Sequence, residues 1–250
     1  MLATLRAAEL PAFDVASLKP SPATLPGQNI EINLGTWRHG EVVLRNTTLN
    51  DCIRFAYGLV SDEQISGPDW MRSYQFRFDI IAKAPPATPR EQLLLMLQRL
   101  LTERFRLALH REPRAMAHLD LEVAPGSRKL HESLDSTESS LVSYGPGKLI
   151  YRHIPLATLA VLLSRQLKQP VFDRTGIAGF FNIDLQWLPD DLPRPSTGAD
   201  AAPASEASEM SLRPDLFHAV QTQLGLKLEV RKTPVEVLMI DHAEQVPVGN

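Results

Sequence analysis

Residues 88–109, TPREQLLLMLQRLLTERFRLAL, contain the clearest helix start in the chain. Thr88 is expected to be the N-cap, Pro89 the first helical residue, and Glu91 the residue that closes a capping box. The leucines that follow recur at helical spacing and give the helix an apolar face: Leu93, Leu94, Leu97, Leu100 and Leu101. Residues 105–109 then alternate between apolar and polar, which is typical of a strand. We expect this strand to form a hairpin with the alternating residues that end at Val123.

The order of elements around this helix occurs twice in the chain. In each half a strand is followed by a helix, a strand, a second helix and a closing hairpin. Three segments also match in apolar register: residues 49–56 with 156–163 at an offset of 107, residues 76–79 with 181–184, and residues 105–109 with 224–228. We therefore predict an α+β fold of two tandem homologous units, each a small mixed or antiparallel sheet with two helices on one face.

Two segments lie outside the matching units. Residues 126–147 are rich in Ser, Gly and charged residues, and we expect them to link an N-terminal repeat at 1–125 to a C-terminal repeat at 148–250. A second segment, at about 189–211, contains one branched aliphatic residue and no aromatic residue. It cannot bury enough apolar surface to offset the entropy lost on ordering. We expect it to be a disordered insertion within the C-terminal repeat.

Composition and charge argue against several classes of protein, among them nucleic-acid-binding and membrane-spanning proteins. The 250 residues carry a formal net charge of -3, and the pI is about 6.2, which gives no reason to expect nucleic acid as a partner. No stretch approaches the ~20 apolar residues of a membrane span. Residues 1–10 do not resemble a signal peptide, although they are compatible with what remains after one has been removed. The single cysteine, Cys52, excludes an intrachain disulfide, and no cofactor or metal motif is present, so we expect no cofactor.

A small group of titratable residues is the best candidate for a catalytic site. His110 and His118 would face each other across the expected hairpin, with Glu112 and Asp120 nearby. Histidine and carboxylate side chains in such a group are suited to hydrolysis of an ester or lactone, or to metal-assisted hydrolysis. The competing interpretation, which the pattern favours, is the exposed polar face of a two-stranded ribbon. The discriminating observation is whether these side chains converge in one pocket.

Four other residues are candidates for binding. Trp70 follows a Gly-Pro-Asp turn, where an aromatic ring can serve as a ligand platform but more often covers a small core. Arg104, Arg106 and Arg111 belong to a cluster of basic residues around the expected strand. Such a cluster is usually a solvated sheet face, and the sharper alternative is a groove that binds an anion.

Several segments together resemble a family of uncharacterised bacterial proteins, the soil-associated protein family, some of whose members are fused to membrane-bound antibiotic-sensor peptidases of the BlaR type. The segments are FDVASLKPS (13–21), TTLNDCIRFAYGL (47–59), QISGPDW (64–70), FRFDIIAKAP (76–85), LLTERFRLALHREPR (100–114), RTGIAGFFNIDLQW (174–187) and LFHAVQTQLGLKLEVRKTPVEVLMIDHAEQ (216–245). The chain departs from the family's usual pattern at Gly67, which stands alone before the proline, and around residues 116–130. The resemblance implies a periplasmic or secreted location and no established activity.

The order of elements also resembles the short N-terminal domain of secretins and TonB-dependent receptors. That likeness implies binding of a protein or peptide at a sheet edge, by strand addition. The leading expectation is therefore an extracytoplasmic interaction module without catalysis, not membrane-spanning, whose partner is an unknown protein or peptide. The alternatives are a hydrolase with a site near His110 and His118, and a rigid spacer without a ligand.

Overall fold

The computed structural model describes residues 11–22, 33–126, 129–133, 140–145, 147–189 and 214–249. The fold is α+β, as predicted, and the chain divides into two compact units. Unit 1 comprises Met1–Ala115 and Pro234–Asn250, and unit 2 comprises Met116–Thr233. The division expected from the sequence was sequential and placed all of 148–250 in the second unit. Apart from Pro189, the insertion expected at about 189–211 lies outside the described residues.

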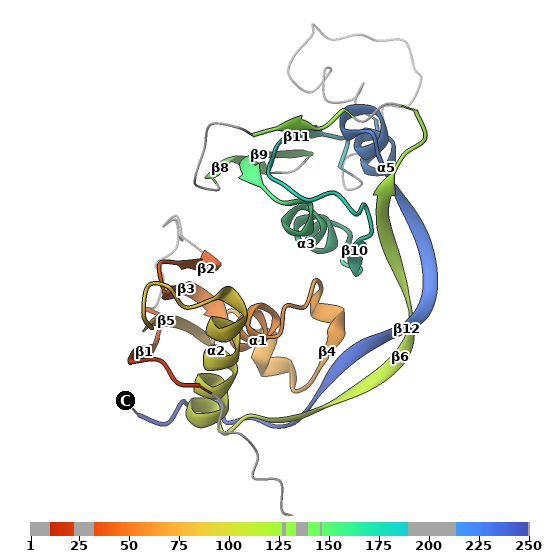
Figure 1. Cartoon of the computed structure of the whole chain (residues 1–250). Coiled ribbons are helices and arrows are strands. Elements are labelled where there is room, and N and C mark those ends of the chain that lie inside the picture. The colour runs from red at the N-terminus through yellow and green to blue at the C-terminus, as the bar shows by residue number, and fades with distance from the viewer. Residues whose placement is uncertain are drawn as a thin grey trace, which may run out of the picture. The chain divides into compact units, whose positions relative to one another are not determined.

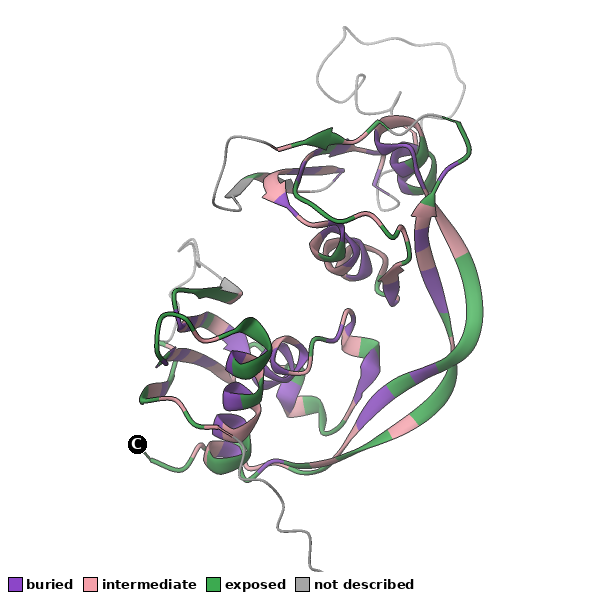
Figure 2. Cartoon of the chain, viewed as in Figure 1, coloured by how far each residue is buried: buried purple, intermediate pink, exposed green. Residues whose placement is uncertain are grey.

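Unit 1 is built on a four-stranded antiparallel sheet. Its strands, in spatial order, are β1 (Val15–Pro20), β5 (Arg77–Lys83), β3 (Glu41–Thr48) and β2 (Asn33–Arg38). Helices α1 (Leu49–Ala56) and α2 (Arg90–Phe105) pack on this sheet, and one hydrophobic core joins Leu44 and Ile80 of the sheet to Ile53 and Leu97 of the helices. Two 3-10 turns, η1 (Asp62–Gln64) and η2 (Asp69–Arg72), flank the short strand β4 (Ile65–Ser66). Figure 2 shows the buried residues on the inner faces of these elements.

The two helix starts of unit 1 follow the sequence to different degrees. Thr48 caps α1 and forms a capping box with Asp51, as its position predicts. The expected start at Thr88 is wrong by one residue, because Pro89 is the N-cap of α2 and no side chain caps it. The N–H of Thr88 donates instead to the carbonyl of Pro85, which holds Thr88 in the preceding turn. None of the described helices is long and apolar enough to cross a membrane.

Unit 2 repeats this arrangement with elements of different length. Its antiparallel sheet has the order β7 (His131–Glu132), β11 (Phe181–Gln186), β9 (Lys148–Ile154) and β8 (Ser140–Gly145). Helix α3 (Leu156–Leu167) and helix α5 (Leu216–Ala219), which continues as a π-helical turn η3 (Val220–Leu224), contribute to its core. The short strand β10 (Val171–Asp173) follows α3 as β4 follows α1. The two units thus share the order of their elements and of their sheet strands.

Each antiparallel sheet contains a β-bulge, and the bulges show that one part of the sequence alignment between the two halves was wrong. Asn46 has φ 54° and its N–H donates to Oδ1 of Asp79, whereas His153 has φ 56° and its N–H donates to Oδ1 of Asn182. The structural counterpart of Asp79 is therefore Asn182. The sequence comparison had matched Asp79 with Asp184, which is exposed and accepts a hydrogen bond from Gln186. An apolar pattern does not reveal where a strand bulges, so the register slipped at this point.

The two expected closing hairpins are wrong, because each is a single long strand. Strand β6 spans Ala108–Val123 and strand β12 spans Leu226–His242, and the two are neighbours in a sheet of order β10-β6-β12-β4 (Figure 1). A tight hairpin turn favours residues that tolerate a positive φ, such as Gly, Asn or Asp. Residues 108–117 and 231–234 contain none of these, and no residue of either strand has a positive φ.

The long strands begin in one unit and end in the other. Leu107, just before β6, is buried in the core of unit 1, whereas Leu119 and Leu121 are buried in the core of unit 2. Strand β12 does the reverse, with Leu226 in the core of unit 2 and Leu238 in that of unit 1. Each unit is thus completed by a strand end that belongs, in sequence order, to the other half of the chain.

Candidate functional site

His110 lies on β6 in unit 1 between two carboxylates. Its Nδ1 is 2.9 Å from Oδ1 of Asp241 on β12, and its Nε2 is 3.3 Å from Oε1 of Glu112. The hydrogen bond with Asp241, followed by that with Glu112, raises the pKa of the imidazole above its ordinary value. The three side chains are about half exposed, so they form a charged group on the surface of the ribbon that strands β6 and β12 make together. The sequence pattern missed Asp241 as the principal partner, because it lies 131 residues away along the chain.

His118 lies in unit 2, and the structure does not bring it to His110. It is buried, its ring packs edge-on against Phe172 with centroids 5.2 Å apart, and its Nε2 is 3.7 Å from Oδ1 of Asp120. The two histidines were expected on facing arms of a hairpin, and they are instead eight positions apart on one extended strand. Among the described residues, no group of three or more His, Cys, Asp or Glu side chains is arranged to hold a metal ion. The geometry therefore gives the hydrolase alternative no support.

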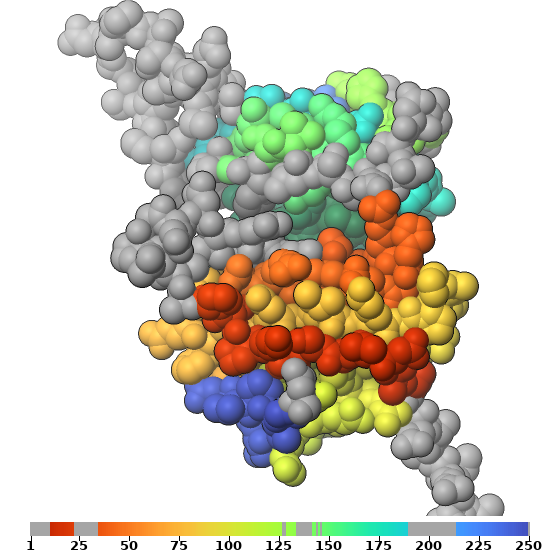
Figure 3. All heavy atoms as spheres, turned by 90° about the vertical axis from the view of Figure 1, so that its left-hand side faces the viewer, coloured from red at the N-terminus to blue at the C-terminus, as the bar shows by residue number. Residues whose placement is uncertain are grey.

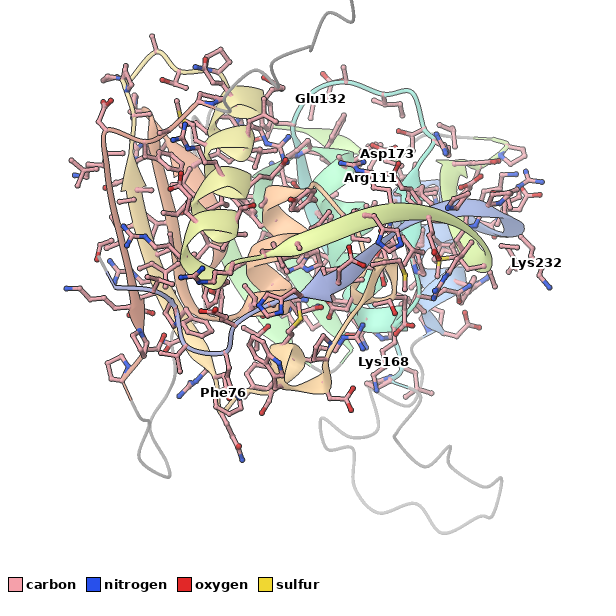
Figure 4. The ribbon with its side chains drawn as sticks, turned by 90° about the horizontal axis from the view of Figure 1, so that it is seen from below. Phe76, Arg111, Glu132, Lys168, Asp173 and Lys232 are labelled. Atoms are coloured by element: carbon pink, nitrogen blue, oxygen red, sulfur yellow. The ribbon has the colours of Figure 1, made fainter. Side chains whose placement is uncertain are left out.

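Each arginine proposed for anion binding has a partner within unit 1. Arg104 donates to the carbonyls of Val248 and Gly249, and Nε of Arg106 lies 3.1 Å from Oε1 of Glu244. Arg111, labelled in Figure 4, forms an ion pair with Glu236 and lies over the ring of Tyr57 at 5.9 Å. These contacts hold the C-terminal segment to the end of α2 and to β6.

Trp70 and Cys52 have packing roles. Trp70 is half-buried against the core of unit 1 and packs edge-on against Phe76, with centroids 6.3 Å apart. Cys52 is fully buried in α1, and burial raises the pKa of its thiol to about 12. A thiol that stays protonated at neutral pH is a poor nucleophile. Trp70 thus contributes to the packing of unit 1, and the Cys52 thiol is protonated at neutral pH.

The outer edge of β1 presents backbone groups that no strand of the described sheet pairs. The N–H of Ser21 donates to the carbonyl of Arg77 on β5 at 2.8 Å. Because antiparallel pairing alternates along a strand, the N–H groups of Ser17 and Lys19 face β5, whereas those of Ala16 and Leu18 face away from it. Figure 3 shows β1, in red, lying across this face of the molecule.

Edge strands are usually guarded against pairing by charge or proline. In β1 the residues that hinder pairing with another strand, Lys19 and Pro20, lie at one end only, and Val15 at the other end is 66% exposed. The sequence predicted this strand, but its place at the edge depends on the order of strands in the sheet. Residues 15–18 therefore form an accessible edge, which we call the β1 edge.

Comparison with known proteins gives a family and no activity. No curated protein matches the chain, and no solved structure matches it. A model of a family described as protein of unknown function (DUF3738) matches residues 50–243, which include most elements of both units. The two-unit α+β chain therefore belongs to the DUF3738 family of proteins of unknown function.

Proposed function

We propose that the chain is a non-catalytic interaction module that binds an extended segment of a partner protein by strand addition at the β1 edge. The observation that carries the proposal is the pair of outward-facing N–H groups at Ala16 and Leu18 beside an exposed Val15. An added strand would pair with these groups along residues 15–18, before Pro20, which has no N–H to offer. Backbone pairing provides the affinity, and side chains opposite Val15 and Ser17 select the partner.

The chain's own construction supports this mode of binding. Strand β4 has only two residues and pairs in parallel with Leu238 and Met239 of β12, which arrive from the far end of the sequence. Strand β10 pairs in the same way with residues 119–121 of β6. Short strands in this family member thus accept strands that are remote in the chain, and main-chain hydrogen bonds are a large part of each such contact.

We further propose that the module acts outside the cytoplasm, in the periplasm or as a secreted protein. The support is the resemblance to the soil-associated family, which implies a periplasmic or secreted location and includes members joined to BlaR-type sensors. Cell fractionation of the natural gene product tests this part separately, and recovery in the cytosol alone would contradict it.

The binding proposal is tested with two proline variants of neighbouring residues. Ala16→Pro removes an outward N–H and leaves the pairing of β1 with β5 intact, whereas Ser17→Pro removes an N–H that faces β5. We expect a library of displayed ten-residue peptides to yield binders of the natural chain that Ala16→Pro no longer retains, with little change in its melting temperature. Ser17→Pro should instead lower the melting temperature. A library without binders, or binders that Ala16→Pro retains, would contradict the proposal.

A further inference from the structure

We propose that the C-terminal arm, residues 234–249, exchanges between two copies of this chain, so that unit 1 of one copy is completed by the arm of the other. This inference is independent of the β1 edge, because the arm docks at different residues. The arm follows unit 2 in the sequence and yet belongs to unit 1. Its residue Leu238 is buried in the core of unit 1, and Val235 and Val237 are buried as well.

The arm contacts residues that precede it by more than a hundred positions in the sequence. Leu238 pairs with Ile65 of β4, and Nε2 of Gln64 donates to the carbonyl of Glu236 at 3.4 Å. Gly67 leaves room for Ile240, since a Cβ at that glycine would lie 2.9 Å from the side chain of Ile240. The arm of any copy presents these same atoms, so a second chain can make every one of these contacts.

The end of the arm is held to helix α2 in the same way. The N–H of Glu244 donates to the carbonyl of Phe105 at 2.7 Å, and the N–H of Val248 donates to that of Arg104 at 2.7 Å. These bonds satisfy carbonyls at the C-terminal end of the helix, which lack partners within it. The ion pair of Arg106 with Glu244 lies beside these hydrogen bonds and adds specificity for the sequence of this arm.

The chain already contains one exchange of this kind. The end of β6 completes unit 2 through pairing of Leu119 with Val171, as the end of β12 completes unit 1 through pairing of Leu238 with Ile65. Leu119 and Leu238 are 119 positions apart, the same offset that relates Leu107 to Leu226 at the starts of the two strands. The end of β6 and the end of β12 thus occupy equivalent positions, each in the unit to which the other strand's start belongs.

The connection to the arm lies outside both hydrophobic cores. Residues 230–234 are exposed in succession, and Lys232 projects into solvent (Figure 4). None of these residues is buried in a core, and the contacts that a different path of the chain gives up are strand pairing with β6 and the ion pairs of Arg231 with Asp120 and Glu122. Exchange of an identical element between protomers is a low-cost route to dimers, because the interface is the one that the monomer already has.

The test uses two full-length chains that each carry one added cysteine. One chain carries Ile65→Cys and the other Leu238→Cys, at facing positions that are both buried. The two chains are unfolded together, refolded at a series of concentrations and oxidised. We expect a disulfide-linked pair of chains whose fraction rises with chain concentration, together with a dimer of wild-type chain on size-exclusion chromatography with light scattering.

Two controls make the result decisive. A single chain with both substitutions shows that the facing positions can form a disulfide, and a mixture of chains with Tyr74→Cys and Val230→Cys, both exposed, reports random collisions. Linkage well above the collision control supports exchange. Linkage no greater than that control at any concentration, or a wild-type chain that refolds only to monomer, overturns it. Light scattering decides the matter if the doubly substituted chain forms no disulfide.

Discussion

Helices α1 and α3 differ in chemistry although the frameworks around them match. In α1, Asp51 and Arg54 are buried and form an ion pair at 3.4 Å. At the offset of 107 residues, α3 has Thr158 and Val161 in their places. The second unit folds on the same plan without these charges. The comparison teaches that the same strand order forms around shared apolar positions with or without a buried ion pair in the first helix.

Removal of the cation from this pair should produce the largest effect. Arg54→Leu removes the guanidinium that lies beside the buried Asp51 carboxylate, and loss of one member of a buried ion pair costs about 3–5 kcal/mol. The variant also loses the contact of Arg54 with Asp62 at 3.4 Å. Urea denaturation of the variant and the natural chain measures the difference in unfolding free energy. Val161→Leu in unit 2 is the matched control and should cost less than about 1.5 kcal/mol.

Transplanting the residues of unit 2 sharpens the same comparison. The double variant Asp51→Thr and Arg54→Val removes both charges and keeps a hydroxyl at the N3 position of α1. We expect it to be more stable than Arg54→Leu, because no unpaired charge remains buried. A double variant no more stable than Arg54→Leu would show that unit 1 requires the charges themselves.

The exchange of strand ends predicts where two leucine variants act. Leu119→Ala and Leu238→Ala should each cost about 2–5 kcal/mol, because each removes a buried side chain from a packed core. Leu119→Ala should weaken hydrogen-exchange protection in α3 and β10 of unit 2, whereas Leu238→Ala should do so around β4 of unit 1. Loss of protection in the opposite units would show that the strand ends fold back on their own halves.

The sequence predicts local features well and the choice of strand partners poorly. The cap of α1 depends on Thr48 and Asp51, which are three residues apart, and it was predicted correctly. The closing hairpins were not, because β6 and β12 continue through Pro113 and Pro234 to partners in the other unit. The lack of Gly, Asn and Asp in these segments was the available signal against a turn.

A smaller effect is expected where the second helix of each unit ends. Arg106 caps α2 in the left-handed region at φ 47°, whereas Gly225 does so after η3 at φ 67°. A residue with a Cβ is strained there by about 1 kcal/mol, so Arg106→Gly should stabilise the chain by about that amount. The ion pair of Arg106 with Glu244 is largely exposed and offsets little of this gain. Gly225→Ala should lower the melting temperature, and Arg106→Gly should raise it.

The candidate site shows the same limit of sequence reasoning. His110 and Glu112 are two residues apart on one strand, so their proximity was predictable. The contact of His110 with Asp241 depends on β12 returning to unit 1, which no local pattern encodes. The edge position of β1 likewise follows from strand order. Pairing between strands remote in the sequence therefore determines both the composition of the charged group around His110 and the position of β1 at the edge of its sheet.

The smallest effect concerns the titration of His110, which lies where β6 and β12 belong to unit 1. Its pKa is raised in the fold above the ordinary value of 6.5, chiefly by the hydrogen bond with Asp241. The charged imidazole therefore adds stability that is complete below pH 6.5 and is lost as the pH rises through the raised pKa. NMR titration of the imidazole should give a lower pKa in Asp241→Asn, and a smaller decrease in Glu112→Gln. An unchanged pKa in Asp241→Asn would show that β12 does not lie beside His110 in solution, which would contradict the return of the arm to unit 1.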